Sequence, residues 1–591
     1  MKTVSLCMIV KDGERYIEQC IASVFEVVSE VIIVDTGSTD NTLERVKRFH
    51  PQIYHYKWNN NFADARNLSL KHAKSDYILV LDADEVVYPE DLPKLTERIN
   101  NTDADAISIK FHNITDENSE DTFNTHIGLR IFKNNSFHFE GAIHEQPIFH
   151  GADRKAVLEN ADIKVKHYGY LPSNAGEKKR NRNMPILKEL LEKDPNSAFH
   201  LFNMGNEYLN IGDYDTALTY YEKSNKYKDN TLAYTPHLMY RMATCLHKMK
   251  RNEESLAIIA DGLGLYPACT DFEYLRGLIL TKMKRFSLAL DSFRRCMDMG
   301  EAPPSLSFFS ETSNFRPLVE MARIYYYMDD YSKALDCYMK AIQINPKKVD
   351  IIYHITKMLN KIFADKNTVY QNLCNLFADS SYKPNVMVMT DALLDEKLIE
   401  QANTALSKCS DNAAEPDADL YFSRGRLLFY TQKYEAAFEM FSRCVKPGIA
   451  RGILPDKKQR SYDYMTACSL LCTDLHVEYL EMVNALEDTV DRAVYLAFQQ
   501  VSDASLDSSA FGRITSVLSK LLSVRAYDVF EHALCILNLV DSNEVLLLLA
   551  DIYYQNEFHD MAVKTILRSV KELDIINTNA VFILNKEFCI N

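Results

Sequence analysis

The pattern of apolar and polar residues divides the chain into two parts. In the first part, short apolar runs alternate with stretches of helical spacing. A short run of branched apolar residues predicts a strand buried on both faces, and apolar residues at helical spacing predict a helix. This alternation indicates right-handed crossovers and a mostly parallel sheet. The predicted strands are residues 3–10, 31–34, 53–58, 76–85, 105–112 and 162–169, and the predicted helices are 14–28, 42–49 and 62–73.

In the second part, from residue 198 onwards, only helical spacing remains. Windows of a small residue, a large residue, then Ala or Ser and a further large residue are typical of tetratricopeptide repeats, whose helix pairs stack into a superhelix. These windows begin at Gly205, Ala243, Gly277, Ala322, Gly425 and Ala550. We therefore expect an α/β domain at residues 1–175, a linker helix at 176–197, tetratricopeptide repeats at 198–350, and degenerate helical repeats with a C-terminal solenoid at 351–591.

Acidic side chains cluster where the predicted strand 76–85 ends. Asp82, Asp84 and Glu85 follow one another closely, and such carboxylates repel each other unless a positive group lies among them. Ligands bind at the carboxyl ends of strands in open α/β sheets. A divalent cation, Mn²⁺ or Mg²⁺, fits this place because it prefers carboxylate oxygens and is often shared with phosphates. The alternative is a solvated acidic turn without a ligand.

Two further charged residues fall near the same edge of the predicted sheet. Asp35 ends the strand 31–34, and Arg66 lies on the helix 62–73. Together these groups suit a nucleotide. The carboxylate can accept hydrogen bonds from the base or the ribose hydroxyls, the arginine supplies positive charge, and a metal can bind the diphosphate. The chain has no GxGxxG after its first strand and no GxxxxGK[ST], which removes the usual dinucleotide and P-loop interpretations.

Charge and cysteine content narrow the class of protein. The 591 residues carry a formal net charge of −15, which argues against a general nucleic-acid binder. The 13 cysteines include no CxxC pair, so we expect reduced thiols in a cytoplasmic protein. The N-terminus lacks a signal-peptide pattern and no apolar run is long enough for a transmembrane helix, so no membrane span is expected.

Four segments within residues 3–86 occur in a specific order: SLCMIVKDGE, VDTGSTDNT, FADARN and VLDADE. In this order and spacing they resemble family-two glycosyltransferases. The resemblance implies the GT-A fold, a Rossmann-like α/β domain, here followed by an all-α tetratricopeptide-like solenoid. It also implies a UDP-sugar donor and inversion at the anomeric carbon.

The resemblance implies roles for single residues as well. Asp35 would contact the uracil or ribose, and Arg66 the nucleotide. Asp82 and Asp84 would form the DXD pair of that family, with Asp82 towards the ribose and the metal and Asp84 on the metal. Ile9 would border the nucleotide pocket.

The segment GAIHEQ, residues 141–146, resembles a motif in a subset of this family that includes the S-glycosyltransferases of antimicrobial peptides. An inverting transfer needs a base that takes the acceptor's proton. Glu145 or His144 could be that base, because the ED pair of the wider family is not found. A purely structural hydrogen bond is the third interpretation.

Three further residues have both a functional and a structural interpretation. His167 ends the last predicted strand and, by the resemblance, could be a third metal ligand, although a lone histidine is more often an ordinary core or surface side chain. Lys179 and Arg182 belong to the only dense basic run, EKKRNR. They could offset charge on a departing diphosphate, or they could be solvent-exposed side chains at the start of a helix.

The predicted function is that of a metal-dependent, inverting glycosyltransferase of a bacterium. Its donor would be a UDP-sugar, and its acceptor a Ser, Thr or Cys side chain of a peptide or protein, such as flagellin or a secreted peptide, recognised by the helical repeats. The first alternative is an envelope glycan or lipid-linked saccharide as acceptor, and the second is a non-enzymatic interaction scaffold. Both the solenoid and the transferase subset permit a homodimer.

Overall fold

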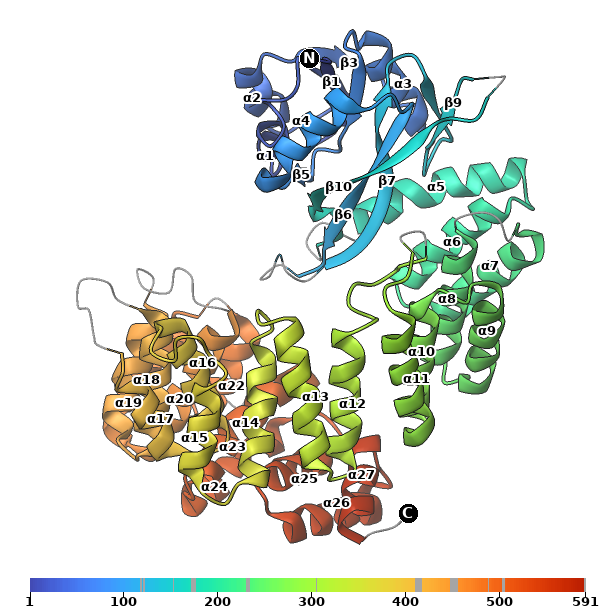
Figure 1. The fold of residues 1–591 in the computed structure, drawn as a ribbon. Coiled ribbons are helices and arrows are strands. Elements are labelled where there is room, and N and C mark those ends of the chain that lie inside the picture. Colours follow the sequence, from blue (N-terminus) through green and yellow to red (C-terminus); the bar gives the residue numbers. More distant parts are fainter. Residues whose placement is uncertain are drawn as a thin grey trace. The chain divides into compact units, whose positions relative to one another are not determined.

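The computed structural model divides into two compact units, Met1–Asn345 and Pro346–Asn591, and each is described by itself (Figure 1). The side chains of residues 177–179 and 455 lie outside the described set. The structure describes residues 1–116, 120, 123–151, 154–171, 177–229, 234–303, 306–409, 417–446, 455–486, 488–501 and 505–588.

The first unit contains a sheet of eight strands in the order β3-β2-β1-β4-β7-β6-β10-β5. Strands β3, β2, β1 and β4 pair in parallel, and so do β6 and β10. Strand β7 is antiparallel to both of its neighbours, and β5 is antiparallel to β10. The predicted mostly parallel sheet is confirmed. The strands are β1 Val4–Val10, β2 Glu30–Asp35, β3 Gln52–His55, β4 Tyr77–Val80, β5 Glu85–Val87, β6 Ala106–Ile114, β7 Phe123–Lys133 and β10 Leu158–His167.

Both faces of the sheet are covered, which explains why its strands are continuous apolar runs. Leu6 and Met8 point into the core beneath α1 (Ile17–Ala22), α2 (Thr42–Val46) and α4 (Leu92–Asn101). Cys7, between them in sequence, points to the opposite core beneath α3 (Phe62–His72) and the hairpin of β8 (Phe137–Glu140) and β9 (Gln146–Phe149). The period of two along β1 thus assigns neighbouring side chains to different cores.

The predicted strand 76–85 is two strands. β4 ends at Val80, residues 81–84 form a turn, and Glu85 begins β5, which pairs with β10 at the far edge of the sheet. The turn closes with a hydrogen bond from the Glu85 amide to the Asp82 carbonyl oxygen, 3.0 Å long. The acidic residues therefore occupy a crossing between strands. Strands β7, β8 and β9 were not predicted, because most of β7 is only half-buried and lacks a continuous apolar run.

Helical repeats complete the first unit. The predicted tetratricopeptide spacing is confirmed in the helix pairs α6–α7, α8–α9, α10–α11 and α12–α13. Its small residues are needed because a Cβ atom at Gly277 would lie 2.5 Å from the Phe293 ring of the paired helix. The helices are α5 Glu177–Lys193, α6 Ala198–Asn210, α7 Tyr214–Tyr227, α8 Thr235–Lys248, α9 Asn252–Leu265, α10 Thr270–Lys282, α11 Phe286–Met299, α12 Phe315–Tyr327 and α13 Tyr331–Ile344.

The described residues of the second unit are almost entirely helical. Its large apolar core runs from α18 to α25. The helices are α14 Asp350–Ile362, α15 Lys366–Cys374, α16 Lys383–Asp395, α17 Ile399–Leu406, α18 Ala418–Tyr430, α19 Tyr434–Val445, α20 Pro455–Leu471, α21 His476–Asn484, α22 Thr489–Phe498, α23 Phe511–Ser523, α24 Tyr527–Ala533, α25 Val545–Gln555, α26 His559–Leu573 and α27 Thr578–Phe588.

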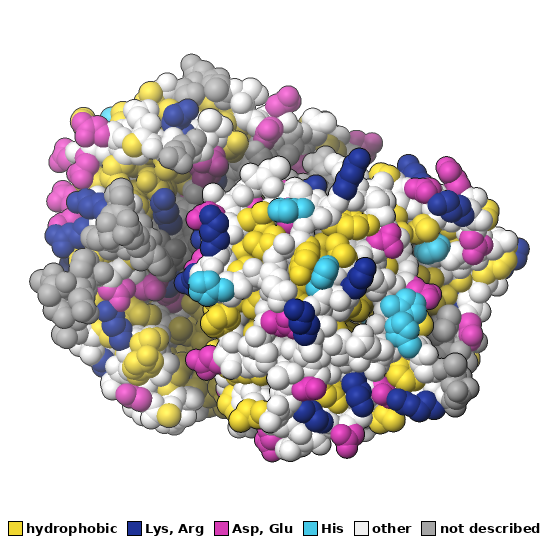
Figure 2. Space-filling model, turned by 90° about the horizontal axis from the view of Figure 1, so that it is seen from above, with side chains coloured by type: hydrophobic (Ala, Val, Ile, Leu, Met, Phe, Trp, Pro, Cys, Tyr) yellow, Lys and Arg dark blue, Asp and Glu magenta, His cyan; other side chains and the backbone are white. Residues whose placement is uncertain are grey.

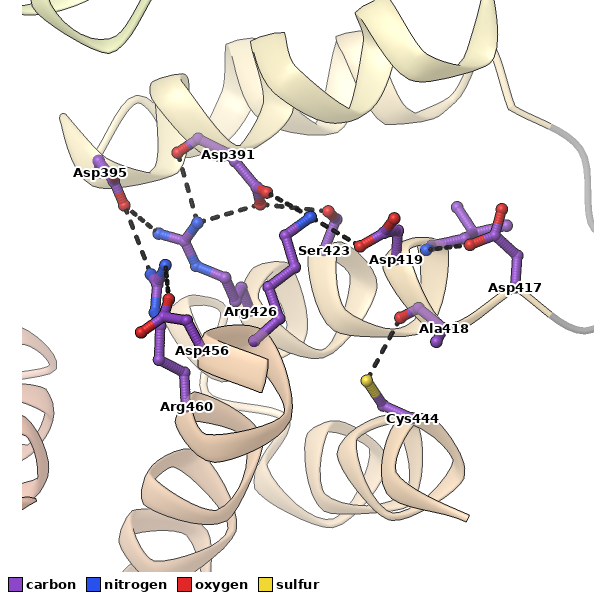
Figure 3. A network of polar contacts seen from close by, with 12 residues as sticks. Asp391, Asp395, Asp417, Ala418, Asp419, Ser423, Arg426, Cys444, Asp456 and Arg460 are labelled. Carbon is purple, nitrogen blue, oxygen red and sulfur yellow. Dashed lines mark hydrogen bonds and ion pairs between the residues drawn. The ribbon is translucent and has the colours of Figure 1, made fainter. Parts of the chain in front are cut away.

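A buried arginine links three of these helices (Figure 3). Arg426 of α18 is 1% exposed, and its Nη1 and Nη2 lie 3.0 Å from Asp391 Oδ1 and 2.5 Å from Asp395 Oδ1 of α16. Lys457 of α20 adds contacts of 3.6 Å to Asp391 and 2.7 Å to Asp419. Each buried charge therefore has an opposite charge beside it, as burial requires.

The surface mixes charges of both signs. On the face seen in Figure 2, Lys and Arg side chains are interspersed with Asp and Glu side chains and with apolar residues. Among the described helices, none combines the length and the apolar composition that crossing a membrane would require.

Candidate active site

Arg66 of α3 lies between two carboxylates. Its Nη2 is 2.7 Å from Asp82 Oδ1, and its Nε is 2.5 Å from Glu145 Oε1. The third nitrogen, Nη1, is buried and has no hydrogen-bond partner among the described residues, in a side chain that is only 7% exposed. A buried N–H group without an acceptor is costly. The free Nη1 therefore marks a place where an acceptor atom of a ligand would be stabilised.

The local sequence explains how Arg66 comes to face the sheet. Asn61 caps α3, accepting a hydrogen bond from the Asp64 amide at 3.3 Å. Ala63 and Ala65 are small and buried, which allows the helix to lie close to the strands. The next position on that side of the helix is Arg66, so its guanidinium reaches the carboxyl end of β4.

A second arginine, Arg130 of β7, orders the acidic turn. Its Nη2 lies 2.6 Å from Glu85 Oε1 and 3.6 Å from Asp82 Oδ2. The other oxygen of the fully buried Glu85 accepts a hydrogen bond from the Asp82 amide at 2.9 Å. Burial alone would raise the pKa of Asp82, but the guanidinium groups of Arg66 and Arg130 outweigh burial and hold this pKa well below its usual range. Asp82 is therefore an ionised carboxylate held in one orientation.

Asp84 and His167 face each other on the other side of the turn. Asp84 Oδ1 lies 3.7 Å from His167 Nε2. Asn113 Oδ1 lies 3.0 Å from His167 Nδ1, so it can accept the Nδ1 proton and leave the Nε2 lone pair towards Asp84. A Cβ atom at Gly169 would lie 2.7 Å from Asp84 Oδ2 and 2.6 Å from His167 Nε2, so the glycine keeps the space beside both groups open. One carboxylate and one imidazole beside such a space fit a divalent cation.

Asp82 does not join this pair directly. Among the described residues, Asp82, Asp84 and His167 do not form a group whose ligand atoms all lie within 4.8 Å of one another. The reason is that both oxygens of Asp82 face arginines. The three-ligand set expected from the sequence is therefore divided into Asp84 with His167 and Asp82 with Arg66.

Asp35 and Ile9 lie at the carboxyl ends of neighbouring strands. In the β1–β2 register Ile9 is opposite Val34, and Val10 is opposite Asp35. Asp35 is buried, and its Oδ1 accepts a hydrogen bond from the Ser38 amide at 3.0 Å. Its Oδ2 lies 3.3 Å from His55 Nδ1. Because β1 also pairs with β4, these residues share one edge of the sheet with Asp82, as the sequence predicted.

The loop with Glu145 is held by the first helices of the solenoid. Ile143 packs in one buried cluster with Ile186 and Leu187 of α5 and Met204 of α6. The Ala142 carbonyl oxygen accepts a hydrogen bond from the amide that begins α3, 2.9 Å long. The loop is therefore fixed from both sides, and the repeats help to position Glu145.

His144 and Arg182 lie at the rim of this site. His144 is exposed, with φ of 54°, a left-handed conformation that histidine adopts more readily than most residues, and its ring centre is 6.3 Å from that of Phe199. Arg182 of α5 is exposed, stacks over the Phe62 ring at 4.8 Å, and is within electrostatic range of Glu145. The side chain of Lys179 lies outside the described residues.

Three groups at the site received no firm role from the sequence. In the sequence, Glu85 stood out only as part of the acidic cluster and Gly169 only as the end of a predicted strand, and Asn113 did not stand out. Glu85 directly follows Asp84 in the sequence, so its position could have indicated that it belongs to the site. Asn113 and Gly169 lie beside His167 and Asp84 because β6 pairs with β10 and because the chain turns after β10. No local sequence pattern predicts this pairing or this turn.

Comparisons with known proteins agree with this division of the chain. Residues 5–160 match the profile of glycosyl transferase family 2, and residues 186–219 and 317–348 match profiles of the tetratricopeptide repeat. The prophage-derived glycosyltransferase SunS of Bacillus subtilis is 29% identical over 47% of this chain and 67% of its own length. A tetratricopeptide repeat-containing protein of Synechococcus elongatus is 27% identical over 41% of this chain and 61% of its own length.

Solved structures show only distant likeness. MamA of Desulfovibrio magneticus is 18% identical, with a TM-score of 0.25, over 30% of this chain and 93% of that one. Glucosyl-3-phosphoglycerate synthase of Mycobacterium tuberculosis, in a complex with Mn²⁺ and UDP, is 22% identical, with a TM-score of 0.17, over 19% of this chain and 44% of that one. TM-scores this low do not establish a shared overall architecture.

Proposed function

We propose that the chain is a metal-dependent, inverting glycosyltransferase, because residues 5–160 match glycosyl transferase family 2 and tetratricopeptide repeats follow them. It moves a sugar from a nucleotide diphosphate, with UDP as the expected carrier, to a Ser, Thr or Cys side chain of a peptide or protein. The observation that carries this proposal is the buried Nη1 of Arg66, which has no partner among the described residues and lies in the side chain that pairs with the ionised Asp82.

In this proposal the two halves of the acidic turn have different tasks. Asp84 and His167 hold the divalent cation, which supplies positive charge against the diphosphate when it is bound. Asp82, held by the arginines, accepts hydrogen bonds from the ribose. Asp35 and Ile9 border the uracil and ribose at the ends of β2 and β1.

The free Nη1 of Arg66 suits an oxygen of the nucleotide. Lys179 and Arg182 would offset charge on the departing diphosphate from the helix α5. Positive groups placed where charge develops are the largest contribution to many such reactions.

Glu145 is the proposed base. Arg66 occupies one of its oxygens, at 2.5 Å, and the second oxygen takes the proton of the acceptor hydroxyl or thiol. The bond from the acceptor atom to the anomeric carbon then forms on one face of the sugar while the bond to the diphosphate breaks on the other. The products are the glycosylated side chain and the nucleoside diphosphate, and His144 is the alternative base.

The repeats are proposed to present the acceptor. The contact of Ile143 with α5 and α6 supports this, because it joins the loop of the proposed base to the solenoid. Transfer assays that compare Ser, Thr and Cys peptides with lipid-linked saccharides test the acceptor class. Transfer to the saccharides alone would favour an envelope enzyme instead.

Thermal melting of the full chain with UDP, GDP, CDP and dTDP, each with and without Mn²⁺, tests the donor site. A ligand at a hundredfold excess over its dissociation constant stabilises the folded state by about 2.7 kcal/mol. We expect a UDP shift that needs Mn²⁺ and is lost in Asp84→Asn. Asp162→Asn is the matched control, since Asp162 is 75% exposed and its ion pair with Lys94 is long, at 3.9 Å. No shift with any nucleotide would leave the scaffold interpretation.

A further inference from the structure

Arg241 belongs to the solenoid but lies near the candidate active site. It is on α8, and its guanidinium carbon lies 5.7 Å from the centre of the Phe202 ring of α6. Its side chain is half-buried, and its charge is within electrostatic range of the buried Tyr221 of α7. The guanidinium thus lies over an aromatic ring of the first repeat.

Residues of the transferase domain lie near Arg241. Tyr170, just after β10, and His144, beside the proposed base, are both within electrostatic range of its charge. Tyr170 is also within range of Asp84, and its ring centre is 5.2 Å from that of His167. Tyr170 therefore connects Arg241 to the part of the site that holds Asp84 and His167.

Arg241 has no carboxylate partner among the described residues. It forms no ion pair there, whereas Arg66 and Arg130 are both paired with carboxylates. A half-buried guanidinium that lies over an aromatic ring and lacks a counter-charge favours an anionic ligand. The nearest anion that the proposed reaction supplies is the diphosphate of the donor.

We propose that Arg241 binds the diphosphate of the nucleotide sugar, so that the first repeats of the solenoid complete the donor site. The inference rests on the proposed function. As the bond between the anomeric carbon and the diphosphate breaks, negative charge grows on the departing oxygen. A guanidinium offers two parallel N–H donors to a phosphate and is therefore well suited to this charge.

Calorimetric titration of the full chain with UDP and UMP in the presence of Mn²⁺ tests the inference. The β-phosphate distinguishes the two ligands, so their affinity ratio reports on contacts to that group. We expect Arg241→Gln to weaken UDP binding at least tenfold and UMP binding much less. Arg241→Lys keeps the charge without the paired donors. Its affinity for UDP should therefore lie between the affinities of the wild type and of Arg241→Gln.

Arg285→Gln is the matched control, because Arg285 is exposed on the solenoid and is paired with Glu253 at 2.6 Å. It should bind both nucleotides as the wild type does. Melting curves without ligand show whether each variant folds. If Arg241→Gln does not fold, the ratio of UDP to UMP affinity in Arg241→Lys tests the inference instead.

An unchanged UDP affinity in Arg241→Gln would overturn the inference, and a raised KM for the acceptor in the same variant would assign the guanidinium to the acceptor instead. A wild type that binds neither UDP nor any other nucleoside diphosphate would refute the proposed function, and this inference with it. The two failures are therefore distinguishable.

Discussion

At the scale of single residues, the geometry of Arg66 decides how the site is built. One planar guanidinium holds Asp82 and Glu145 through two of its nitrogens, and its third nitrogen has no partner in the part of the chain that the structure describes. A lysine ammonium has its three donors on one nitrogen and lacks the planar fork by which Arg66 reaches the two carboxylates with separate nitrogens. The residue type, and not only its charge, is therefore essential to the arrangement.

Arg66→Lys is expected to lower kcat/KM for transfer by two or more orders of magnitude, the scale on which losing a positioned charge acts in other enzymes. Steady-state kinetics measure this loss. Arg48→Lys is the matched control, because Arg48 is 58% exposed and paired with Glu18 on the surface. Equal activity of both variants would show that Arg66 has only a charge to contribute.

Glycine at the repeat crossings allows a second test at this scale. A methyl group at Gly277 would meet the Phe293 ring, whereas nothing lies within 4 Å of one at Gly264 near the end of α9. Gly277→Ala should lower the free energy of unfolding by about 1–3 kcal/mol through overpacking. Gly264→Ala should raise it by about 0.4–1 kcal/mol. Thermal melting of the two variants gives the sign of each change, and two stabilised variants would contradict this account of the crossing.

At the scale of elements, buried charges join helices that the repeat spacing alone would only stack. The contacts of Arg426 and Lys457 with the acidic residues of α16 connect α16, α18 and α20 (Figure 3). Removing one member of such a network leaves the others buried without a partner. These contacts therefore specify which helices meet in a part of the solenoid where the consensus residues are degenerate.

Arg426→Ala is expected to destabilise the second unit by roughly 3–5 kcal/mol, because the buried Asp391 would lose its 3.0 Å ion pair and be left with the longer 3.6 Å ion pair with Lys457. Urea unfolding measures the change. Lys340→Ala is the control: Lys340 forms an exposed pair with Asp336 at 2.7 Å, and such pairs contribute about 0–1 kcal/mol. A loss no larger than that of the control would show that the network adds nothing to stability.

A buried carboxyl group of α10 makes the first unit sensitive to pH. Asp271 accepts hydrogen bonds from the amides of Phe308 and Phe309, at 3.1 and 3.2 Å, and burial raises its pKa from 3.8 to about 7. The unfolded chain ionises this group at the lower pKa. Stability is therefore lost as the pH rises from 3.8 towards 7 and is constant above that.

Asp271→Asn cannot ionise, so the wild type should lose stability relative to this variant between pH 5 and pH 8. The loss should be on the order of 3 kcal/mol, from 1.36 kcal/mol per unit of pKa shift. Melting curves at the two pH values measure the difference. Asp291→Asn, at an exposed position of α11, should show no such trend, and the same trend in both variants would refute the assignment to Asp271.

At the scale of the whole molecule, the chain consists of two units with separate interiors. All residues proposed for the donor site belong to the first unit. Hydrogen exchange of the full chain should therefore show protection by UDP and Mn²⁺ within residues 1–345 and none within 346–591. Equal protection in both units would mean that the second unit also takes part in donor binding.

Local pattern was sufficient for much of this architecture. Apolar runs and turn residues determined the strand that ends at Asp35 and the strand that precedes the turn with Asp82, because a strand buried on both faces needs a continuous apolar run. The repeat spacing determined the helix pairs, since the close helix crossing at Gly277 leaves no room for a Cβ atom. The similarity of residues 5–160 to glycosyl transferase family 2 also followed from four short segments in a specific order.

Contacts between distant segments were decided only by the tertiary structure. Asp82 faces Arg66 and Arg130 instead of joining His167, because α3 and β7 bring their guanidinium groups to the same turn. Arg241 reaches the site through packing of α8 against α6, which leaves no mark in the spacing along the chain. Charge complementarity in a folded interior depends on which surfaces of the helices and strands pack against each other. The spacing of residues along the chain shows which surface an element buries, but not the surface of the other element that covers it.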